Sequence, residues 1–242
     1  MTQPVLVETS DRRRLEPLVV KIGGSLIGEE RLAGVVATIA RSRRPIVVVP
    51  GGGLFADGVR ATQKAHGTSD RAAHAMALMA MHQMGLLIED MQPRLIAVET
   101  MAAIRQALAV NRIPVWLPLR LAEGDDTIPA DWSITSDGLA ARLAERLRFD
   151  AVMLIKSRRV PRGPTAEELA ADGVVDPVFA DIVARAGLAF RILGPGEERE
   201  LALICASTRR GALPVRRSPG RQERLRRGVR RAHGGGNVHP RG

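Results

Sequence analysis

Six short apolar runs, alternating with longer amphipathic stretches, constrain the fold of this chain more than any other feature. The runs lie at residues 17–22, 45–49, 94–98, 113–117, 151–155 and 188–193. Each is rich in Val, Ile, Leu or Ala and lacks alternating polar residues, as expected of a strand buried on both faces of a sheet. Helix-like patterns lie at 29–41, 54–65, 70–91, 99–109, 136–148, 178–186 and 197–205. The alternation predicts an α/β fold, a three-layer αβα sandwich with a central, mostly parallel sheet.

Composition restricts the class of protein further. The chain has 242 residues, of which 45% are hydrophobic, so a sizeable core is available. The single cysteine, Cys205, cannot form an internal disulfide, and its apolar neighbours favour a core residue over a nucleophile. No uncharged apolar run approaches the roughly 18 residues that a membrane span needs, and the N-terminus lacks the apolar region of a signal peptide. We therefore expect a cytoplasmic protein that makes no contact with a membrane.

The positive charge is concentrated at the C-terminal end. Residues 209–242 carry eleven arginines and one acid, Glu223, which accounts for the whole net charge of +10. Residues 1–208 are therefore balanced, which excludes a basic nucleic-acid-binding surface over the body of the protein. Glycines at 234–236 and Pro240 favour a disordered tail, and no aromatic residue is available there to stack on bases. A tail without function, a tail that contacts nucleic acid, and a shifted reading frame near residue 209 remain open.

Two glycine clusters follow two of the predicted strands. Gly23 and Gly24 come after the strand at 17–22, and the glycines at 51–53 come after the strand at 45–49. Each cluster precedes a predicted helix, whose N-terminal N–H groups favour phosphate, and glycine lets the backbone approach a ligand closely. A structural turn explains either cluster alone. Two clusters at the carboxyl ends of strands in one parallel sheet favour a ligand site.

Neither of two common nucleotide-binding motifs is complete. A Walker A loop is absent. Gly51, Gly53 and Ala56 match the G-x-G-x-x-A form of the dinucleotide fingerprint, but no acid ends the next strand, and Asp70 lies at a helix start instead. A dinucleotide site is therefore disfavoured.

Two lysines and an aspartate form a second candidate set. Lys21 lies at the carboxyl end of the strand at 17–22, Lys156 directly follows the strand at 151–155, and Asp137 lies in the first turn of a predicted helix. Ser136 as N-cap and Asp137 as a first-turn acid are a sufficient structural explanation. Alternatively, Asp137 points into a site, where it orients both lysines and keeps them protonated. Fixed cations of this kind stabilise the charge on a phosphoryl group during its transfer.

Three motifs carry a resemblance to a known group of proteins. "VVKIGGSLI", "VVVPGGGLFADGVR" and "TSDGLAARLAERL", in this order and spacing, resemble the amino acid kinase superfamily. That group includes acetylglutamate, aspartate, uridylate and isopentenyl phosphate kinases, and the resemblance covers about residues 17–205. "GGGLFADGVR" and "DWSITSD" are most similar to the archaeal-type branch that phosphorylates an aminomethyl-furan-methyl phosphate in methanofuran biosynthesis. Relatives of this branch occur in methylotrophic bacteria, where the cofactor carries one-carbon units.

The resemblance implies an ATP-dependent kinase and a role for each matched residue. ATP would be the co-substrate, with Mg²⁺ held mainly by its phosphates. The implied catalytic residues are Lys21, Asp137 and Lys156. The implied ATP or phosphate contacts are Gly23, Gly24, Ser25, Ser136 and Arg158. The implied acceptor contacts are Gly51, Gly52, Gly53, Asp57 and Arg60.

Some of these positions allow a second interpretation. Asp57 and Arg60 are three residues apart on a predicted helix and are equally consistent with a solvated ion pair. The chain has "KSRRVPRG" where many family members have a "TDVDG"-like loop, so Arg158 and Arg159 are substitute phosphate contacts. The second catalytic lysine varies in position within the superfamily, and Lys156 is our candidate for it.

The resemblance also implies an organisation of the chain and its partners. Residues 1–16 would be an N-terminal extension, and 17–208 the kinase-like domain, with an acceptor half at about 17–130 and a nucleotide half at about 131–208. A small-molecule phosphate acceptor and a homo-oligomer are expected. We expect no protein-bound metal, because Cys205 is alone and His74 and His82 are too far apart along one helix to form a ligand pair.

The absence of an evident general base bears on the acceptor. A phosphate monoester is largely ionised at neutral pH and needs no base, which favours it over an alcohol. A carboxylate needs none either, so a carboxylate kinase such as acetylglutamate or aspartate kinase is the alternative. A non-catalytic nucleotide or oxyanion binder with the same fold, and an inactive truncated or frame-shifted chain, are further alternatives.

Overall fold

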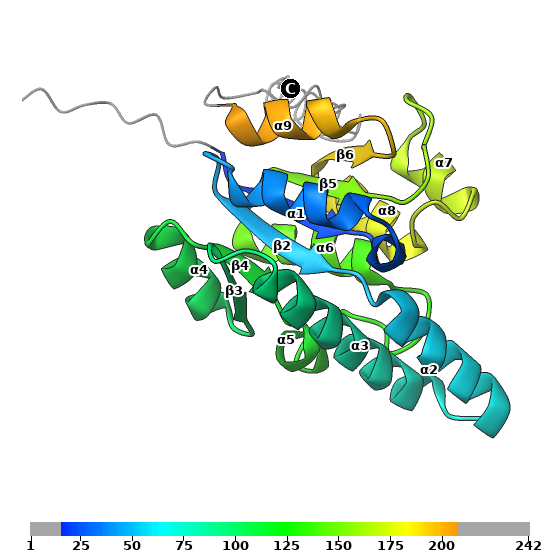
Figure 1. The fold of residues 1–242 in the computed structure, drawn as a ribbon. Coiled ribbons are helices and arrows are strands. Elements are labelled where there is room, and N and C mark those ends of the chain that lie inside the picture. The colour runs from blue at the N-terminus through cyan, green and yellow to red at the C-terminus, as the bar shows by residue number, and fades with distance from the viewer. Residues whose placement is uncertain (1–15, 208–242) are drawn as a thin grey trace, which may run out of the picture.

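A computed structural model describes residues 16–207, which form a single sheet covered by helices (Figure 1). The expectations for the N-terminal extension up to residue 15 and for the arginine-rich tail lie outside the described residues. The strands are β1 (Leu18–Ile22), β2 (Ile46–Pro50), β3 (Leu95–Val98), β4 (Ile113–Trp116), β5 (Ala151–Ile155) and β6 (Ala189–Leu193). Their order in the sheet is β3-β4-β2-β1-β5-β6, and every pairing is parallel. The predicted α/β class is confirmed, and the six predicted strands agree with the observed bounds to within one residue.

The helices fill the gaps between the strands, as the alternating pattern predicted. They are the 3-10 helix η1 (Gly24–Gly28) and α1 (Arg31–Ala40), α2 (Gly53–His66), α3 (Asp70–Asp90), α4 (Met101–Ala109), α5 (Leu119–Glu123), α6 (Ser136–Leu147), α7 (Ala166–Ala171), α8 (Pro177–Ala186) and α9 (Glu198–Ala206). η1, α5 and α7 were not predicted from the sequence. All three are short, with five or six residues each, and so provide too few turns for a periodic pattern. A capping box between Thr165 and Glu168 was the available signal for α7.

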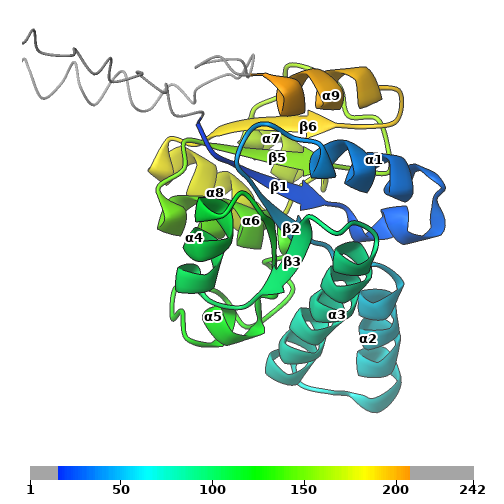
Figure 2. The same cartoon turned by 60° about the vertical axis from the view of Figure 1, so that its left-hand side comes forward.

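The strands separate two hydrophobic cores. Along β1, Val19 packs into the core shared with α6 and α8, whereas Leu18 and Val20 pack into the core shared with α1 and α9. This alternation follows from the period of two in a strand. Figures 1 and 2 show the resulting layers, with α1 and α9 on one side of the sheet and α6 and α8 on the other.

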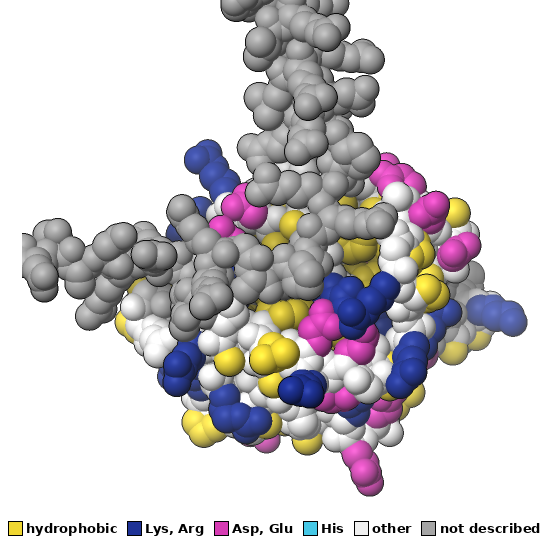
Figure 3. Space-filling view, turned by 90° about the horizontal axis from the view of Figure 1, so that it is seen from above, with side chains coloured by type: hydrophobic (Ala, Val, Ile, Leu, Met, Phe, Trp, Pro, Cys, Tyr) yellow, Lys and Arg dark blue, Asp and Glu magenta, His cyan; other side chains and the backbone are white. Residues whose placement is uncertain are grey.

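Ion pairs hold α9 over the edge of the sheet. Arg31 Nε lies 2.6 Å from Glu198 Oε1, and Arg191 Nε lies 2.7 Å from Glu200 Oε1. Figure 3 looks onto this side of the molecule, where basic and acidic side chains are mixed. The mixture agrees with the balanced charge of residues 1–208.

The connections around β1 and β5 create a crevice. After β1 the chain enters η1 and α1 on one face of the sheet, and after β5 it returns through α7 and α8 on the other face. β1 and β5 are neighbours in the sheet and stay paired to their last residues, so the two connections part directly after their carboxyl ends. Parallel sheets bind ligands where neighbouring connections part in this way.

Three local expectations can be compared with the structure. α3 begins at Asp70, as predicted, and Ser69 caps it, with its side chain accepting a hydrogen bond from Ala72 N. The N-cap of α6 is Thr135 and not Ser136, because Thr135 is extended and its side chain accepts from Asp137 N, whereas Ser136 is already helical. Cys205 is buried in the core, and burial raises the pKa of its thiol to about 11, so it remains protonated at neutral pH.

Among residues 16–207, none of the helices combines the length and apolar character needed to cross a bilayer.

Candidate active site

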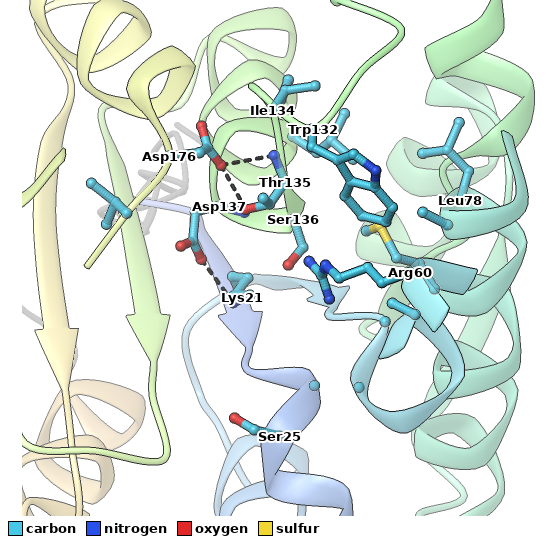
Figure 4. Close-up of a pocket in the computed structure, with 18 of the residues that line it drawn as sticks. Lys21, Ser25, Arg60, Leu78, Trp132, Ile134, Thr135, Ser136, Asp137 and Asp176 are labelled. Carbon is cyan, nitrogen blue, oxygen red and sulfur yellow. Dashed lines mark hydrogen bonds and ion pairs between the residues drawn. The ribbon is translucent and has the colours of Figure 1, made fainter. Parts of the chain in front are cut away.

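A cleft of about 480 Å³ lies at the carboxyl ends of β1 and β2, between α2, α3, α6 and the segment before α8 (Figure 4). Most of the residues expected at the site line it. Those present in its wall are Lys21, Gly24, Ser25, Gly52, Gly53, Asp57, Arg60, Ser136, Asp137 and Lys156. Gly23, Gly51 and Arg158 do not line it.

The two lysines and Asp137 meet in this cleft. Lys21 lies on the same face of β1 as Val19, which is the face covered by α6, and Lys156 continues the corresponding face of β5. Asp137, in the first turn of α6, lies between them. Lys21 Nζ is 2.7 Å from Asp137 Oδ1, and Lys156 Nζ forms a very short contact with Asp137 Oδ2. Lys156 Nζ also donates a hydrogen bond of 2.9 Å to Val174 O.

The electrostatics of this cluster suit an anionic ligand. Burial by itself would raise the pKa of Asp137, but Lys21 and Lys156 together hold it below its ordinary value. Burial and the charge of Lys21 lower the pKa of Lys156, while Asp137 and Asp176 partly offset that decrease. Two cations thus share the carboxylate of Asp137 in a site that excludes much of the surrounding water.

The glycine clusters pack against one another. A Cβ on Gly24 would lie 2.0 Å from Gly53 N, and a Cβ on Gly51 would lie 2.3 Å from Gly24 N. Gly53 also has a positive φ of 54°, and Gly23 N donates a 2.8 Å hydrogen bond to Ile155 O. The glycines therefore join the loops after β1, β2 and β5 backbone to backbone, and this junction forms the base of the cleft.

The Gly24→Ala substitution tests this junction. We expect the variant to unfold at a clearly lower temperature than the parent, because overpacked sites typically lose about 1–3 kcal/mol. Gly34→Ala in α1 is the matched control, since a Cβ there meets nothing within 4 Å and alanine favours a helix. Thermal denaturation followed by circular dichroism compares the two. An unchanged unfolding temperature for Gly24→Ala would contradict the proposed close packing.

Arg60 lies at the other end of the cleft. Its Nη1 is 3.0 Å from Asp57 Oδ1, so the predicted i, i+3 ion pair forms, although both side chains are more than half exposed. The Arg60 guanidinium carbon lies 4.4 Å from the centre of the Trp132 ring, and Trp132 Nε1 donates a 2.6 Å hydrogen bond to Gln63 Oε1. Figure 4 shows Trp132 and Arg60 facing the cleft from opposite elements. Trp132 belongs to the motif "DWSITSD", but its position at the site was not predicted from the sequence.

The loop after β5 is turned towards neighbouring backbone. Arg158 Nη2 lies 3.3 Å from Gly173 O, and Arg159 Nε lies 3.0 Å from Pro195 O. Ser25 Oγ donates to Ser157 Oγ at 2.8 Å, which links this loop to η1. Arg158 and Arg159 therefore support the loop in this structure, and their contact with phosphate stays a prediction.

Two further residues of the cleft wall were not anticipated. His74 of α3 lines the cleft, and burial lowers the pKa of its imidazole, so it is neutral near pH 7. Asp176 lies directly before α8 and accepts hydrogen bonds from both α6 and α8. The dipeptide Asp176–Pro177 is a typical helix start and could have identified the cap of α8. The hydrogen bonds between Asp176 and the start of α6 join residues that are 38 and 41 positions apart in the sequence. Local sequence patterns do not reveal contacts over such separations.

Comparison with known proteins identifies relatives of this chain. Residues 16–158 match the Amino acid kinase family. The [5-(aminomethyl)furan-3-yl]methyl phosphate kinase of Methanocaldococcus jannaschii is 28% identical over 138 residues, which is 56% of this chain and 63% of the relative. The match thus spans less than two thirds of that protein.

Solved structures show the same fold. The uridylate kinase of Archaeoglobus fulgidus superposes with a TM-score of 0.59 at 17% identity, covering 77% of this chain and 94% of that one. The UMP kinase of Ureaplasma parvum gives a TM-score of 0.57 at 14% identity, covering 75% of this chain and 90% of that one.

Within the residues that the structure describes, no group of three or more His, Cys, Asp or Glu side chains could hold a metal ion.

Proposed function

This chain belongs to the amino acid kinase family, and from that premise we propose that it transfers the γ-phosphoryl group of ATP to a small phosphate monoester. The acceptor that we propose is [5-(aminomethyl)furan-3-yl]methyl phosphate, the compound in the name of the Methanocaldococcus relative. One observation carries the proposal: Lys21 and Lys156 converge on the buried carboxylate of Asp137 at the carboxyl ends of adjacent strands, inside a cleft.

The residues present fit a polyphosphate. The ammonium groups of Lys21 and Lys156 line the cleft, and the backbone of Gly24, Gly52 and Gly53 borders the same space without side chains. Lys21 and Lys156 would hold phosphate oxygens and stabilise charge on them during transfer, while Asp137 holds both ammonium groups in place. ATP supplies the phosphoryl group, together with a Mg²⁺ that its own phosphates hold.

The state of Asp137 bears on the class of acceptor. Both of its oxygens are engaged by lysines, and its pKa is lowered, so it is poorly suited to remove a proton from an acceptor. A phosphate monoester, with a second pKa of about 6, already provides an anionic oxygen at neutral pH. That oxygen attacks the γ-phosphorus, the bond to the β-phosphate oxygen breaks, and ADP leaves.

The far end of the cleft supports an acceptor with an anionic group and an apolar body. The Arg60 guanidinium, held against Trp132 and Asp57, provides a fixed cation there. Leu78, Met81 and Ile134 line the wall beside it. We propose that Arg60 binds the acceptor phosphate and that the apolar wall contacts the ring.

An acceptor panel tests the proposal. Purified protein with Mg-ATP is assayed for ADP release with the aminomethyl-furan phosphate, isopentenyl phosphate, N-acetylglutamate and aspartate as acceptors. We expect turnover on the furan phosphate, and we expect the His74→Gln variant to retain it, because an ionised acceptor needs no base. Turnover on N-acetylglutamate or aspartate alone would identify a carboxylate kinase. Tight nucleotide binding without transfer to any acceptor would identify the non-catalytic binder.

A further inference from the structure

One carboxylate joins the N-termini of two helices beside the site. Asp176 Oδ1 accepts a 2.7 Å hydrogen bond from Phe179 N and so caps α8. Its Oδ2 accepts from Thr135 N at 2.9 Å, Thr135 Oγ1 at 2.7 Å and Gly138 N at 2.8 Å, all at the start of α6. Asp176 is 7% exposed, and these four donors are uncharged. Its charge therefore depends on hydrogen bonds and on the positive ends of two helix dipoles.

Both partners of the second lysine are attached to this carboxylate. Lys156 Nζ contacts Asp137 and Val174 O. In the sequence, Asp137 lies between Thr135 and Gly138. These are the two residues at the start of α6 that donate hydrogen bonds to Asp176. Val174 lies two positions before Asp176 in the same segment. A shift of Asp176 would therefore move both hydrogen-bond acceptors of Lys156 at once.

The contact between Asp176 and α6 is tightly packed. A Cβ on Gly138 would lie 2.6 Å from Asp176 Oδ1 and 2.8 Å from Ile134 Cγ1. Glycine at this position allows the carboxylate to reach the backbone of α6. The contact between Asp176 and α6 thus depends on two features, the charge of Asp176 and the space at Gly138. Substitutions can change each of them separately.

We propose that Asp176 is a positioning residue for phosphoryl transfer, which holds Asp137 and Val174 in the arrangement that places the Lys156 ammonium in the cleft. The inference rests on the proposed kinase function for its effect on catalysis. Asp176 does not contact the transferred group in this account and acts through Lys156.

The charge of Asp176 provides an independent signature. The charged groups that face Lys156 are Lys21 from β1, Asp137 from α6 and Asp176 before α8. Asp176 and Asp137 raise the pKa of Lys156, against burial and Lys21, which lower it. Removing the negative charge at 176 should lower this pKa further, so Lys156 would lose its proton at a lower pH.

The Asp176→Asn variant tests the proposal through kinetics. We expect kcat to fall by on the order of 10²-fold, the cost of a small misplacement of a catalytic group, with a smaller change in KM for ATP. The alkaline limb of the kcat profile should move to lower pH. Gly34→Ala, in open space on α1, is the control that should keep parental kinetics. Asp176→Asn that is folded and keeps kcat within about twofold of the parent would overturn the proposal.

Lysine labelling tests the same proposal without catalysis. The chain contains three lysines, Lys21, Lys64 and Lys156, and Lys64 is exposed on α2. Acetylation by acetic anhydride over a range of pH, followed by mass spectrometry of each peptide, reports the protonation of each amine. We expect half-maximal labelling of Lys156 at a lower pH in Asp176→Asn than in the parent, with Lys64 unchanged. An unchanged Lys156 profile would contradict the role of Asp176.

The two tests separate the possible failures. If the parent transfers phosphate to none of the acceptors, the proposed function fails, and labelling still decides the link between Asp176 and Lys156. If Asp176→Asn does not fold, Gly138→Ala takes its place. The added methyl group disrupts the same contact between Asp176 and α6 and leaves the charge of Asp176 unchanged. Folded Gly138→Ala with parental kcat would then overturn the proposal.

Discussion

Replacing Lys21 with alanine is expected to lower kcat by about 10³-fold, because fixed cations at the transferred group supply a large share of the catalysis in phosphoryl transfer. Lys21 is 5% exposed, and its ammonium is aimed at the cleft from the end of the central strand β1. Asp137 keeps Lys156 as a partner in the variant, so the fold should be retained. Calorimetric titration with ADP should still detect nucleotide binding while steady-state turnover is lost.

The control for this experiment is Lys64→Ala, which removes an exposed lysine on α2. It should keep the kcat of the parent. Lys21→Arg retains the charge with a different shape and should recover only part of the activity, because a guanidinium does not replace an ammonium in a confined site. A Lys21→Ala variant with more than about a tenth of the parental kcat would remove this residue from the transfer centre.

Asp137→Asn is expected to have the largest combined effect on stability and transfer. The substitution leaves two buried ammonium groups without their carboxylate, and breaking a buried ion pair on one side typically costs about 3–5 kcal/mol. Urea denaturation at neutral pH should show this loss in the free energy of unfolding. Transfer should fall with it, because both lysines lose the carboxylate that holds them in position.

The pH dependence of Asp137→Asn distinguishes electrostatic from purely steric causes. Without Asp137, the pKa of Lys156 in the folded state should fall further below its value in the unfolded chain. The unfolded state then binds more protons over that range, so the stability of the variant should rise as the pH is raised. Its deficit relative to the parent should therefore narrow as the pH is raised towards the ordinary pKa of a lysine. A deficit that is constant with pH, or one no larger than that of the exposed control Asp172→Asn, would contradict the account.

The sheet could be predicted because its strands are buried on both faces. Each strand is a short apolar run, and the burial pattern of β1, β2 and β5 is continuous, so the chain itself marks their bounds. Lys21 and Lys156 could be placed in the site for the same reason. Each is polar at the carboxyl end of such a run, and parallel strands bring these ends to one edge of the sheet.

The contacts between distant segments could not be predicted. The tie between Asp176 and α6, and the stacking of Arg60 on Trp132, join residues that no local pattern relates. The glycines were expected to let the backbone approach a ligand. In the structure, Gly24, Gly51 and Gly53 allow close contact between the backbones of their own two loops. The acceptor and nucleotide halves, and assembly into a homo-oligomer, stay predictions. The described residues form one continuous sheet, which does not by itself separate the halves.

Phosphorus NMR of the reaction products tests the central claim most directly. The protein is incubated with Mg-ATP and [5-(aminomethyl)furan-3-yl]methyl phosphate, alongside the Lys21→Ala variant. We expect the parent to convert the monoester signal into the coupled doublets of a diphosphate, in step with the formation of ADP, and we expect no such conversion by Lys21→Ala. A monoester signal that remains unchanged while N-acetylglutamate or aspartate is phosphorylated, or while no acceptor reacts, would contradict it.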